Sequence, residues 1–219
     1  MKDVSLIIFD CDGTLVDTES LTAHLMTEML QGFGIDINLE ECTSRFIGTK
    51  FSDVAAYVQS HGISIDPEEF ETDYRDRCKV LFKEQLKPIP GVISMLENLN
   101  VPFCIASNGP KEKMEITLEA AGLHSYFPRE HIFSAYDIKR WKPEPDLFNL
   151  ASKRMREPAR NCMVVEDTIH GVKAALSAQM QVAGVNIKHQ ENEIKNMGVA
   201  TYYNIEKLSI DLQSHGLLR

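Results

Sequence analysis

Short apolar runs alternate with amphipathic segments along most of this 219-residue chain. Four runs are rich in branched residues and have no regular polar alternation, which is typical of strands buried on both faces of a parallel sheet. These runs are Val4–Phe9, Val101–Ala106, Asn161–Val165 and Gln181–Val185, and shorter candidates lie at Ile132–Ala135 and Ala200–Tyr203.

Apolar residues at helical spacing separate the last three runs from one another. The segments concerned are Gly91–Leu99, Glu112–Ala121, Pro145–Met155 and Ile169–Ala178. Alternation of strands and helices predicts an α/β fold, in which a Rossmann-like, mostly parallel sheet carries helices on both faces.

Residues 18–84 interrupt this alternation, because they contain helical periodicity and no convincing strand. Three apolar stripes at helical spacing support this interpretation: Leu21, Leu25, Met29 and Leu30; Val54, Tyr57 and Val58; Phe70, Tyr74, Cys78 and Leu81. The sequence therefore predicts a catalytic core domain of residues 1–17 and 85–219 with an inserted helical cap domain of residues 18–84. Ligands of parallel sheets bind beyond the carboxyl ends of the strands, so an insert that follows the first strand is expected to act as a lid.

Candidate chemistry begins where the first apolar run ends, in Asp10-Cys11-Asp12-Gly13-Thr14. One carboxylate could attack phosphorus, and the other could protonate the leaving oxygen and later activate water. Two carboxylates and an anionic substrate repel one another, so a divalent cation is needed, and oxygen ligands favour Mg²⁺. The alternative is a strand that simply stops at an Asp-Gly turn.

Three further polar motifs lie beyond the predicted strands. Ser107 and Asn108 could form a phosphate-binding corner at a helix start, or merely cap that helix. Lys142, before a proline, could be a fixed ammonium that balances the negative charge, or a solvated lysine. Glu166 and Asp167 could complete the oxygen ligands of a cation, although Asp167 could equally cap the next helix.

Composition narrows the classes of partner. The net charge of -9 and the pI near 5.3 argue against general affinity for nucleic acid or anionic membrane. The amino terminus lacks a signal-peptide pattern, and no apolar run is long enough to span a membrane. Five cysteines without Cys-x-x-Cys spacing argue against a disulfide framework or a zinc site. We therefore expect a cytoplasmic monomer with a small phosphorylated metabolite as its partner.

Together the motifs resemble those of the haloacid dehalogenase superfamily of phosphohydrolases. Asp10–Thr14 matches the first motif, Ser107 the second, Lys142 the third and Glu166-Asp167 the fourth. The helical insert is similar to the cap of the branch that contains β-phosphoglucomutase and small sugar-phosphate phosphatases.

The resemblance implies a role for each matching residue. Asp10 would be the nucleophile, and Asp12 the general acid and then base, with its backbone carbonyl on Mg²⁺. Asp167 would ligate Mg²⁺, and Glu166 would ligate it or hold its waters. The phosphoryl oxygens would be bound by Ser107 and Lys142 with Asn108 beside them, and Thr14 would support the loop.

The resemblance implies a Mg²⁺-dependent phosphatase of small phosphorylated sugars or sugar acids, with a phosphosugar mutase as the alternative. Mutases of this branch carry a His, an Arg and a Lys where this chain has Thr22, Phe51 and Ile47, which favours hydrolysis. Dehalogenases lack the second Asp of the pair, which is present here as Asp12. A non-catalytic phospho-ligand sensor would be expected to have lost a catalytic carboxylate.

Substrate selection is expected to come from the cap. Candidates near its first residues and around its Ile47-Gly48-Thr49 loop are Thr18, Glu19, Arg45, Thr49 and Lys50. The two basic residues could meet the distal carboxylate of a sugar acid phosphate. The alternative is that these are solvated charges on a helical lid.

Overall fold

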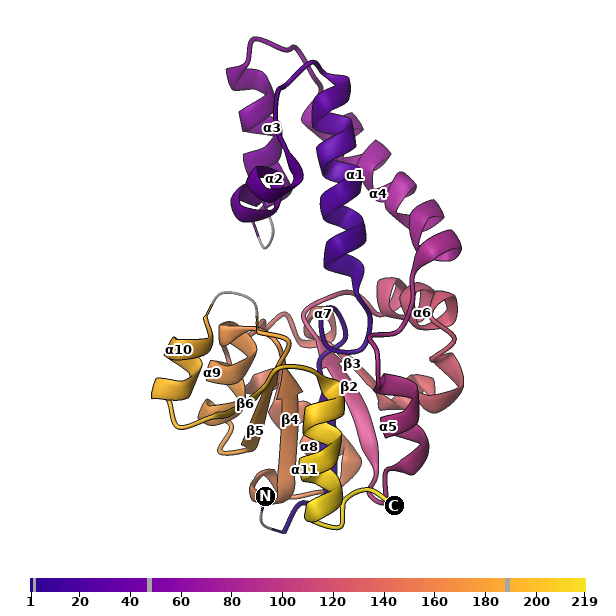
Figure 1. Cartoon of the computed structure of the whole chain (residues 1–219), viewed down its shortest axis with the longest axis vertical. Helices are drawn as coiled ribbons and strands as arrows, with labels where there is room; N and C mark the ends of the chain where they lie inside the picture. Colours follow the sequence, from indigo (N-terminus) through magenta and orange to yellow (C-terminus); the bar gives the residue numbers. More distant parts are fainter. Residues whose placement is uncertain (2, 47–48, 188–189) are drawn as a thin grey trace. The chain divides into compact units, whose positions relative to one another are not determined.

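The computed structural model describes residues 1, 3–46, 49–187 and 190–219 of the chain (Figure 1). It divides into two compact units, Met1–Asp17 with Lys87–Arg219, and Thr18–Leu86. We call them the sheet unit and the helical unit. The return to the sheet unit falls two residues later than the sequence suggested, because the last helix of the helical unit runs to Gln85.

The sheet unit is built on six parallel strands in the order β3-β2-β1-β4-β5-β6. The strands are β1 (Leu6–Phe9), β2 (Phe103–Ser107), β3 (Ile132–Ser134), β4 (Cys162–Glu166), β5 (Gln181–Val185) and β6 (Ala200–Tyr202). All six coincide with predicted runs to within two residues at either end. The predicted parallel sheet is confirmed, and β1, which is buried along its whole length, lies at its centre.

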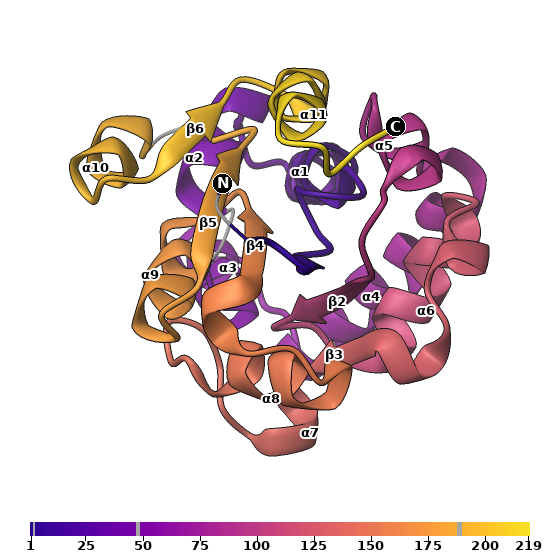
Figure 2. The same ribbon diagram turned by 90° about the horizontal axis from the view of Figure 1, so that it is seen from below.

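Helices cover both faces of this sheet (Figure 2). The helices α8 (Asp146–Met155) and α9 (Ile169–Ser177) pack on one face, where Leu6 and Ile8 of β1 contact Leu147 and Phe148. The helices α5 (Val92–Asn98), α6 (Lys111–Ala120) and α11 (Ile205–Ser214) lie on the other face, and the short α7 (Ala135–Ile138) and α10 (Glu191–Asn196) flank the sheet. Burial of both faces explains the continuous apolar strands.

The helical unit consists of α1 (Thr18–Gly32), α2 (Leu39–Phe46), α3 (Phe51–Ser60) and α4 (Pro67–Gln85). Its core includes Met29, Leu30, Val58 and Phe70, all from the predicted stripes. The sequence analysis did not single out α2, whose apolar residues at helical spacing are only Leu39, Cys42 and Phe46, with Cys42 alone buried.

The chain leaves and re-enters the sheet unit at adjacent positions. Val16 and Pro88 form an antiparallel bridge, and the Ile89 N–H donates to the Leu15 carbonyl at 2.9 Å. The two crossings are thus tied together by backbone hydrogen bonds within the sheet unit.

The five cysteines are buried and none of them forms a disulfide, so each behaves as a small apolar side chain. Over the ranges that the structure describes, every helix is too short or too polar to cross a bilayer.

Candidate active site

Polar residues gather where three neighbouring central strands end. Ser107 is the last residue of β2, Glu166 is the last of β4, and Asp10 directly follows β1 between them. The register pairs Phe9 with Val165, and the Asp10 N–H donates to the Val165 carbonyl at 3.0 Å. The parallel sheet therefore places three of the four predicted motifs at one edge, as the ligand-binding rule for such sheets requires.

The turn after β1 closes tightly against the fourth motif. Gly13 has φ 80°, and a Cβ built on it would lie 2.1 Å from Asp167 Oδ2, so only glycine fits here. The Thr14 hydroxyl donates to Asp167 Oδ1 at 3.0 Å. The first and fourth motifs are thus in direct contact across 153 residues of sequence.

Lys142 is the buried centre of the site, with only 3% of its side chain exposed. Its ammonium Nζ lies 2.5 Å from Asp10 Oδ1 and 2.5 Å from Glu166 Oε1. Its backbone N–H donates to Asn108 Oδ1 at 2.9 Å, which ties the third motif to the second. A solvated lysine is therefore excluded, and we call Asp10, Lys142 and Glu166 the buried triad.

The buried triad carries two carboxylates and one ammonium, so its electrostatics are unbalanced. Burial raises the pKa of Asp10 to about 7, with Glu166 adding to the rise and Lys142 opposing it. Burial by itself would lower the pKa of Lys142, but attraction to the two carboxylates raises it above its ordinary value. The lysine is therefore charged. Its single positive charge does not balance two carboxylates, so a further cation would be stabilised in this site.

Glu166 is held by protein donors at both oxygens. Oε1 receives Lys142, and Oε2 accepts from the N–H groups of Asp167 and Thr168 and from the Thr168 hydroxyl, at 3.1, 3.0 and 2.9 Å. A Cβ on Gly171 of α9 would lie 1.8 Å from Oε1. These contacts let Glu166 hold Lys142 in place, and the expectation that it ligates Mg²⁺ or holds the waters of the ion stays a prediction.

The sequence left open that Ser107 or Asn108 caps α6 and that Asp167 caps α9, and none of these three residues does so. The Thr168 hydroxyl, and not Asp167, caps α9 by accepting from the Gly171 N–H at 3.1 Å. The N-cap of α6 is Pro110, whose ring has no hydrogen-bonding group, so neither Ser107 nor Asn108 caps that helix. The Ser107 Oγ instead accepts from the Gly109 N–H at 3.2 Å.

No three Asp, Glu, His or Cys side chains group as metal ligands among the described residues. Of the four predicted ligands, Glu166 faces Lys142, and Asp12 directs its carboxylate to Lys113. Asp10 contacts Lys142 through Oδ1 and Asp167 accepts from the Thr14 hydroxyl, and both lie beside the turn that carries the backbone carbonyl of Asp12. Mg²⁺ is commonly held by one or two carboxylates and completes its shell with waters and substrate phosphate, so this smaller donor set fits the ion.

Sequence reasoning missed Lys113 and Asn186. Lys113 Nζ lies 2.6 Å from Asp12 Oδ2, and Asn186 Nδ2 donates to the Gly13 carbonyl at 3.2 Å. One signal for the lysine was available: it lies in the first turn of α6, where the helix dipole disfavours a cation and an outside partner is expected. Asn186 has a positive φ of 53°, a local feature that does not identify Gly13 as its partner.

The predicted cap residues all lie in the helical unit. Thr18 is buried, and Glu19 is half-buried in the first turn of α1, whereas Lys50 is exposed at the N-cap of α3. Arg45 is exposed, with its guanidinium 4.8 Å from the centre of the Tyr57 ring. Their contact with substrate stays a prediction.

The structure describes Thr22 and Phe51, which bear on the mutase alternative, and Thr49 of the cap loop. Thr22 donates its hydroxyl to the Thr18 carbonyl of its own helix at 2.9 Å, and Phe51 packs against Phe70 with ring centres 4.9 Å apart. Thr49 donates its hydroxyl to the Phe46 carbonyl at 3.0 Å. The remaining positions, Ile47 and Gly48, lie outside the described residues.

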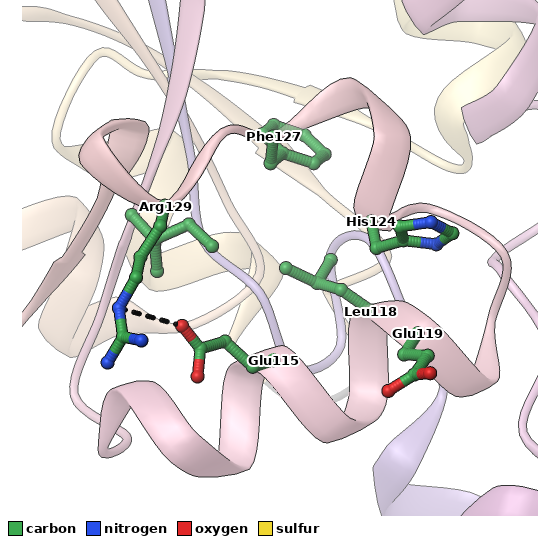
Figure 3. Close-up of a pocket in the computed structure, with 7 residues that line it drawn as sticks. Glu115, Leu118, Glu119, His124, Phe127 and Arg129 are labelled. Atoms are coloured by element: carbon green, nitrogen blue, oxygen red, sulfur yellow. Dashed lines mark ion pairs between the residues drawn. The ribbon is translucent and has the colours of Figure 1, made fainter.

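A separate hollow of about 330 Å³ lies along α6 (Figure 3). Its lining combines apolar side chains with charged ones, among which Arg129 pairs with Glu115 at 3.1 Å. It is lined by Glu115, Leu118, Glu119, His124, Phe127, Arg129 and Ile132. None of these belongs to the predicted site, so we assign no reaction to this hollow.

Comparisons with known proteins agree with the motifs. Residues 7–185 match the model of a family described as haloacid dehalogenase-like hydrolase. The chain is 34% identical over 209 residues to 6-phosphogluconate phosphatase of Escherichia coli (strain K12), covering 95% of this chain and 94% of the relative.

Solved structures share the whole architecture. A HAD family hydrolase from Deinococcus radiodurans R1, solved with bound phosphate and sodium, has a TM-score of 0.86 at 28% identity over 100% of this chain and 99% of its own. A putative β-phosphoglucomutase from Thermotoga maritima has a TM-score of 0.82 at 25% identity, over 96% of this chain and 99% of its own.

Proposed function

This chain belongs to the haloacid dehalogenase-like hydrolase family and is a phosphatase, and on that premise we propose its mechanism, its metal and its substrate class. We propose that it hydrolyses small phosphorylated sugars or sugar acids, with Mg²⁺, through a phosphorylated Asp10. The buried triad carries the proposal, because a carboxylate fixed by Lys142 at 2.5 Å at the end of a central strand is an oriented nucleophile.

The proposed reaction has two displacements. In the first, an Asp10 oxygen attacks phosphorus, the bond from phosphorus to the substrate oxygen breaks, and Asp12 gives its proton to that oxygen. In the second, Asp12 takes a proton from water, the resulting hydroxide attacks phosphorus, and phosphate leaves as the Asp10 carboxylate is restored. Lys142 balances the negative charge that develops on the phosphoryl oxygens, with Ser107 and Asn108 beside it.

Mg²⁺ would be held by the carboxylates of Asp10 and Asp167 and by the backbone carbonyl of Asp12. The support is the donor set, which is all oxygen, and the contact of Asp167 with the Gly13 turn. When bound, the ion supplies positive charge to a site where anions outnumber cations, and it orients the phosphoryl group. A readout independent of turnover is available, because ligand binding to the folded state raises the melting temperature. Mg²⁺ is expected to raise it for the wild type and not for Asp167→Asn.

The substrate class rests on local sequence and on the cap. Ser107–Pro110 and Tyr136–Pro143 resemble the corresponding segments of bacterial 6-phosphogluconate phosphatase, the activity named for the relative at 34% identity. Arg45 and Lys50 are exposed bases that could recognise the distal carboxylate of such a sugar acid. We also propose that the protein works in the reducing cytoplasm, which suits five free cysteines.

A phosphosugar mutase is the alternative, and its support is the similarity to the Thermotoga maritima structure described as a putative β-phosphoglucomutase. Against it stand Thr22, which bonds within its own helix, and Phe51, which packs against Phe70. Neither side chain offers the charge that would grip a bisphosphate intermediate.

The test is phosphate release from a panel of phosphorylated sugars and sugar acids, with Mg²⁺ and with EDTA. The panel includes 6-phosphogluconate and β-glucose 1-phosphate, and Asp10→Asn is the matched inactive control. Metal-dependent release that prefers 6-phosphogluconate is expected. Conversion of glucose 1-phosphate to glucose 6-phosphate without phosphate release would make the protein a mutase.

A further inference from the structure

The Asp12 carboxylate forms an ion pair with Lys113, a different lysine from the one that contacts Asp10. Lys113 Nζ lies 2.6 Å from Asp12 Oδ2, and the two side chains are 40% and 26% exposed. We propose that Lys113 is a positioning residue that orients the Asp12 carboxylate for proton transfer to the leaving oxygen. This inference rests on the proposed function, since the part played by Asp12 in proton transfer belongs to that function.

The pair lies inside the site and not on a remote surface. A Cβ built on Gly109 would be 3.6 Å from Ser107 Oγ, 3.8 Å from Lys113 Cδ and 3.9 Å from Asp12 Oδ2. Three side chains from three separate segments therefore surround one small residue. Because Ser107 is the residue proposed to bind phosphoryl oxygens, the lysine holds Asp12 next to the group that reacts.

The position of Lys113 on its helix points to the same role. It lies in the first turn of α6, where the partial positive charge of the helix disfavours an ammonium. Helix stability thus gives no reason for a lysine here, whereas Asp12 does. Lys111 in the same turn offers a matched comparison, because it pairs with Asp137 Oδ2 at 3.0 Å and has no part in the proposed chemistry.

Orientation matters because the protonated Asp12 carboxyl group gives its proton along the direction of its O–H bond and becomes a carboxylate. A charge-assisted hydrogen bond to Oδ2 restrains both side-chain torsions of Asp12, and this in turn sets where Oδ1 points. Loss of the bond would leave the proton donor chemically intact and poorly aimed, which lowers the rate of the step that needs it.

The first test compares two leaving groups. An alkyl phosphate needs its leaving oxygen protonated, whereas p-nitrophenyl phosphate releases a stable phenolate without that help. For Lys113→Met we expect kcat/KM to fall about 10- to 100-fold for the alkyl phosphate, part of the roughly 10²–10⁴-fold that general acid catalysis supplies. For p-nitrophenyl phosphate we expect no more than about a threefold change. Lys111→Met should leave both values unchanged, and Lys113→Arg should restore part of the alkyl activity.

The second test is a double-mutant cycle with Asp12→Asn. If Lys113 acts through Asp12, Lys113→Met causes no further loss in the Asp12→Asn background. Additive losses, or equal losses with the two leaving groups, would overturn the inference. Absence of phosphate release by the wild type with every substrate and Mg²⁺ would instead overturn the proposed function. Melting temperatures of all variants identify any that fail to fold.

Discussion

Two lysine–aspartate pairs serve one site, and they differ in their access to solvent. Lys142 and Asp10 are 3% and 11% exposed, whereas Lys113 and Asp12 are 40% and 26% exposed. Glu166 holds the first pair further, because its Oε1 accepts from Lys142 while its Oε2 accepts from backbone and hydroxyl donors. The second pair joins a turn to the start of α6 at the edge of the site.

The difference matches the tasks proposed for the two carboxylates. A nucleophile gains from a fixed position and needs no exchange with water, so a buried lysine suits it. A group that gives and takes protons must reach the leaving oxygen and then a water, so partial exposure suits it. Burial also makes the loss of Lys142 costly, because it would leave the carboxylates of Asp10 and Glu166 without a counter-ion in a poorly solvated place.

The largest effect is expected from Asp10→Asn, which removes the nucleophile and keeps the shape. We expect kcat to fall at least about 10⁴-fold, as for other residues that form covalent intermediates. The free energy of unfolding should change by no more than about 1 kcal/mol, since burial already disfavours the charged carboxylate at this position. Phosphate release and urea denaturation measure the two quantities, and substantial retained activity would refute the nucleophile assignment.

Lys142→Met removes the ammonium of the buried triad, and its effects on activity and on stability are measured separately. It leaves two carboxylates buried without a counter-ion, so activity should be lost and the free energy of unfolding should fall by about 3–5 kcal/mol. Lys195→Met is the control, because Lys195 pairs with Glu191 on the surface and should contribute less than about 1 kcal/mol. Lys113→Met should resemble this control in stability, and equal losses for both site lysines would erase the distinction between the pairs.

Gly171→Ala probes the support of the triad without touching its charges. A methyl group there would overlap Glu166 Oε1, so we expect the free energy of unfolding to fall by about 1–3 kcal/mol. Activity should fall with it, because a displaced Glu166 no longer holds Lys142. Gly32→Ala is the matched control in α1, where a Cβ meets nothing within 4 Å and alanine should stabilise the helix by about 0.5–1 kcal/mol.

The smallest effect is expected from Thr14→Val, which removes one hydrogen bond to Asp167. The variant keeps the shape of the buried side chain, so the fold should persist and the apparent affinity for Mg²⁺ should fall about tenfold. A titration of the melting temperature with Mg²⁺ measures this affinity directly. Thr27→Val, which removes a buried hydroxyl bonded to the Ala23 carbonyl in the helical unit, should leave the affinity unchanged.

The sequence predicted most of the sheet because burial on both faces leaves a local trace. Runs such as Val4–Phe9 need no distant partner to be recognised, and their carboxyl ends locate Asp10 and Glu166. The helix α2 left a shorter trace, since only Leu39, Cys42 and Phe46 stand at helical spacing in its sequence.

The contacts of the site were less accessible to sequence reasoning. The contact of Lys113 with Asp12 joins residues 101 positions apart, and that of Asn186 with Gly13 joins residues 173 apart. Each depends on how loops meet after the sheet has formed. Glu166 was expected to ligate the cation or hold its waters, and the sequence did not reveal that Lys142 and Thr168 would contact its two oxygens.

The Val16–Pro88 bridge makes the helical unit a single insertion in the chain of the sheet unit. From the side of the sheet unit, everything between the two bridged positions is one loop whose ends are already joined. The entropy of closing a loop grows only with the logarithm of its length, by about 0.6 kcal/mol per doubling, so the length of this segment hardly affects the stability of the sheet unit. The length of an insertion at this point is therefore expected to have little effect on the register of the strands.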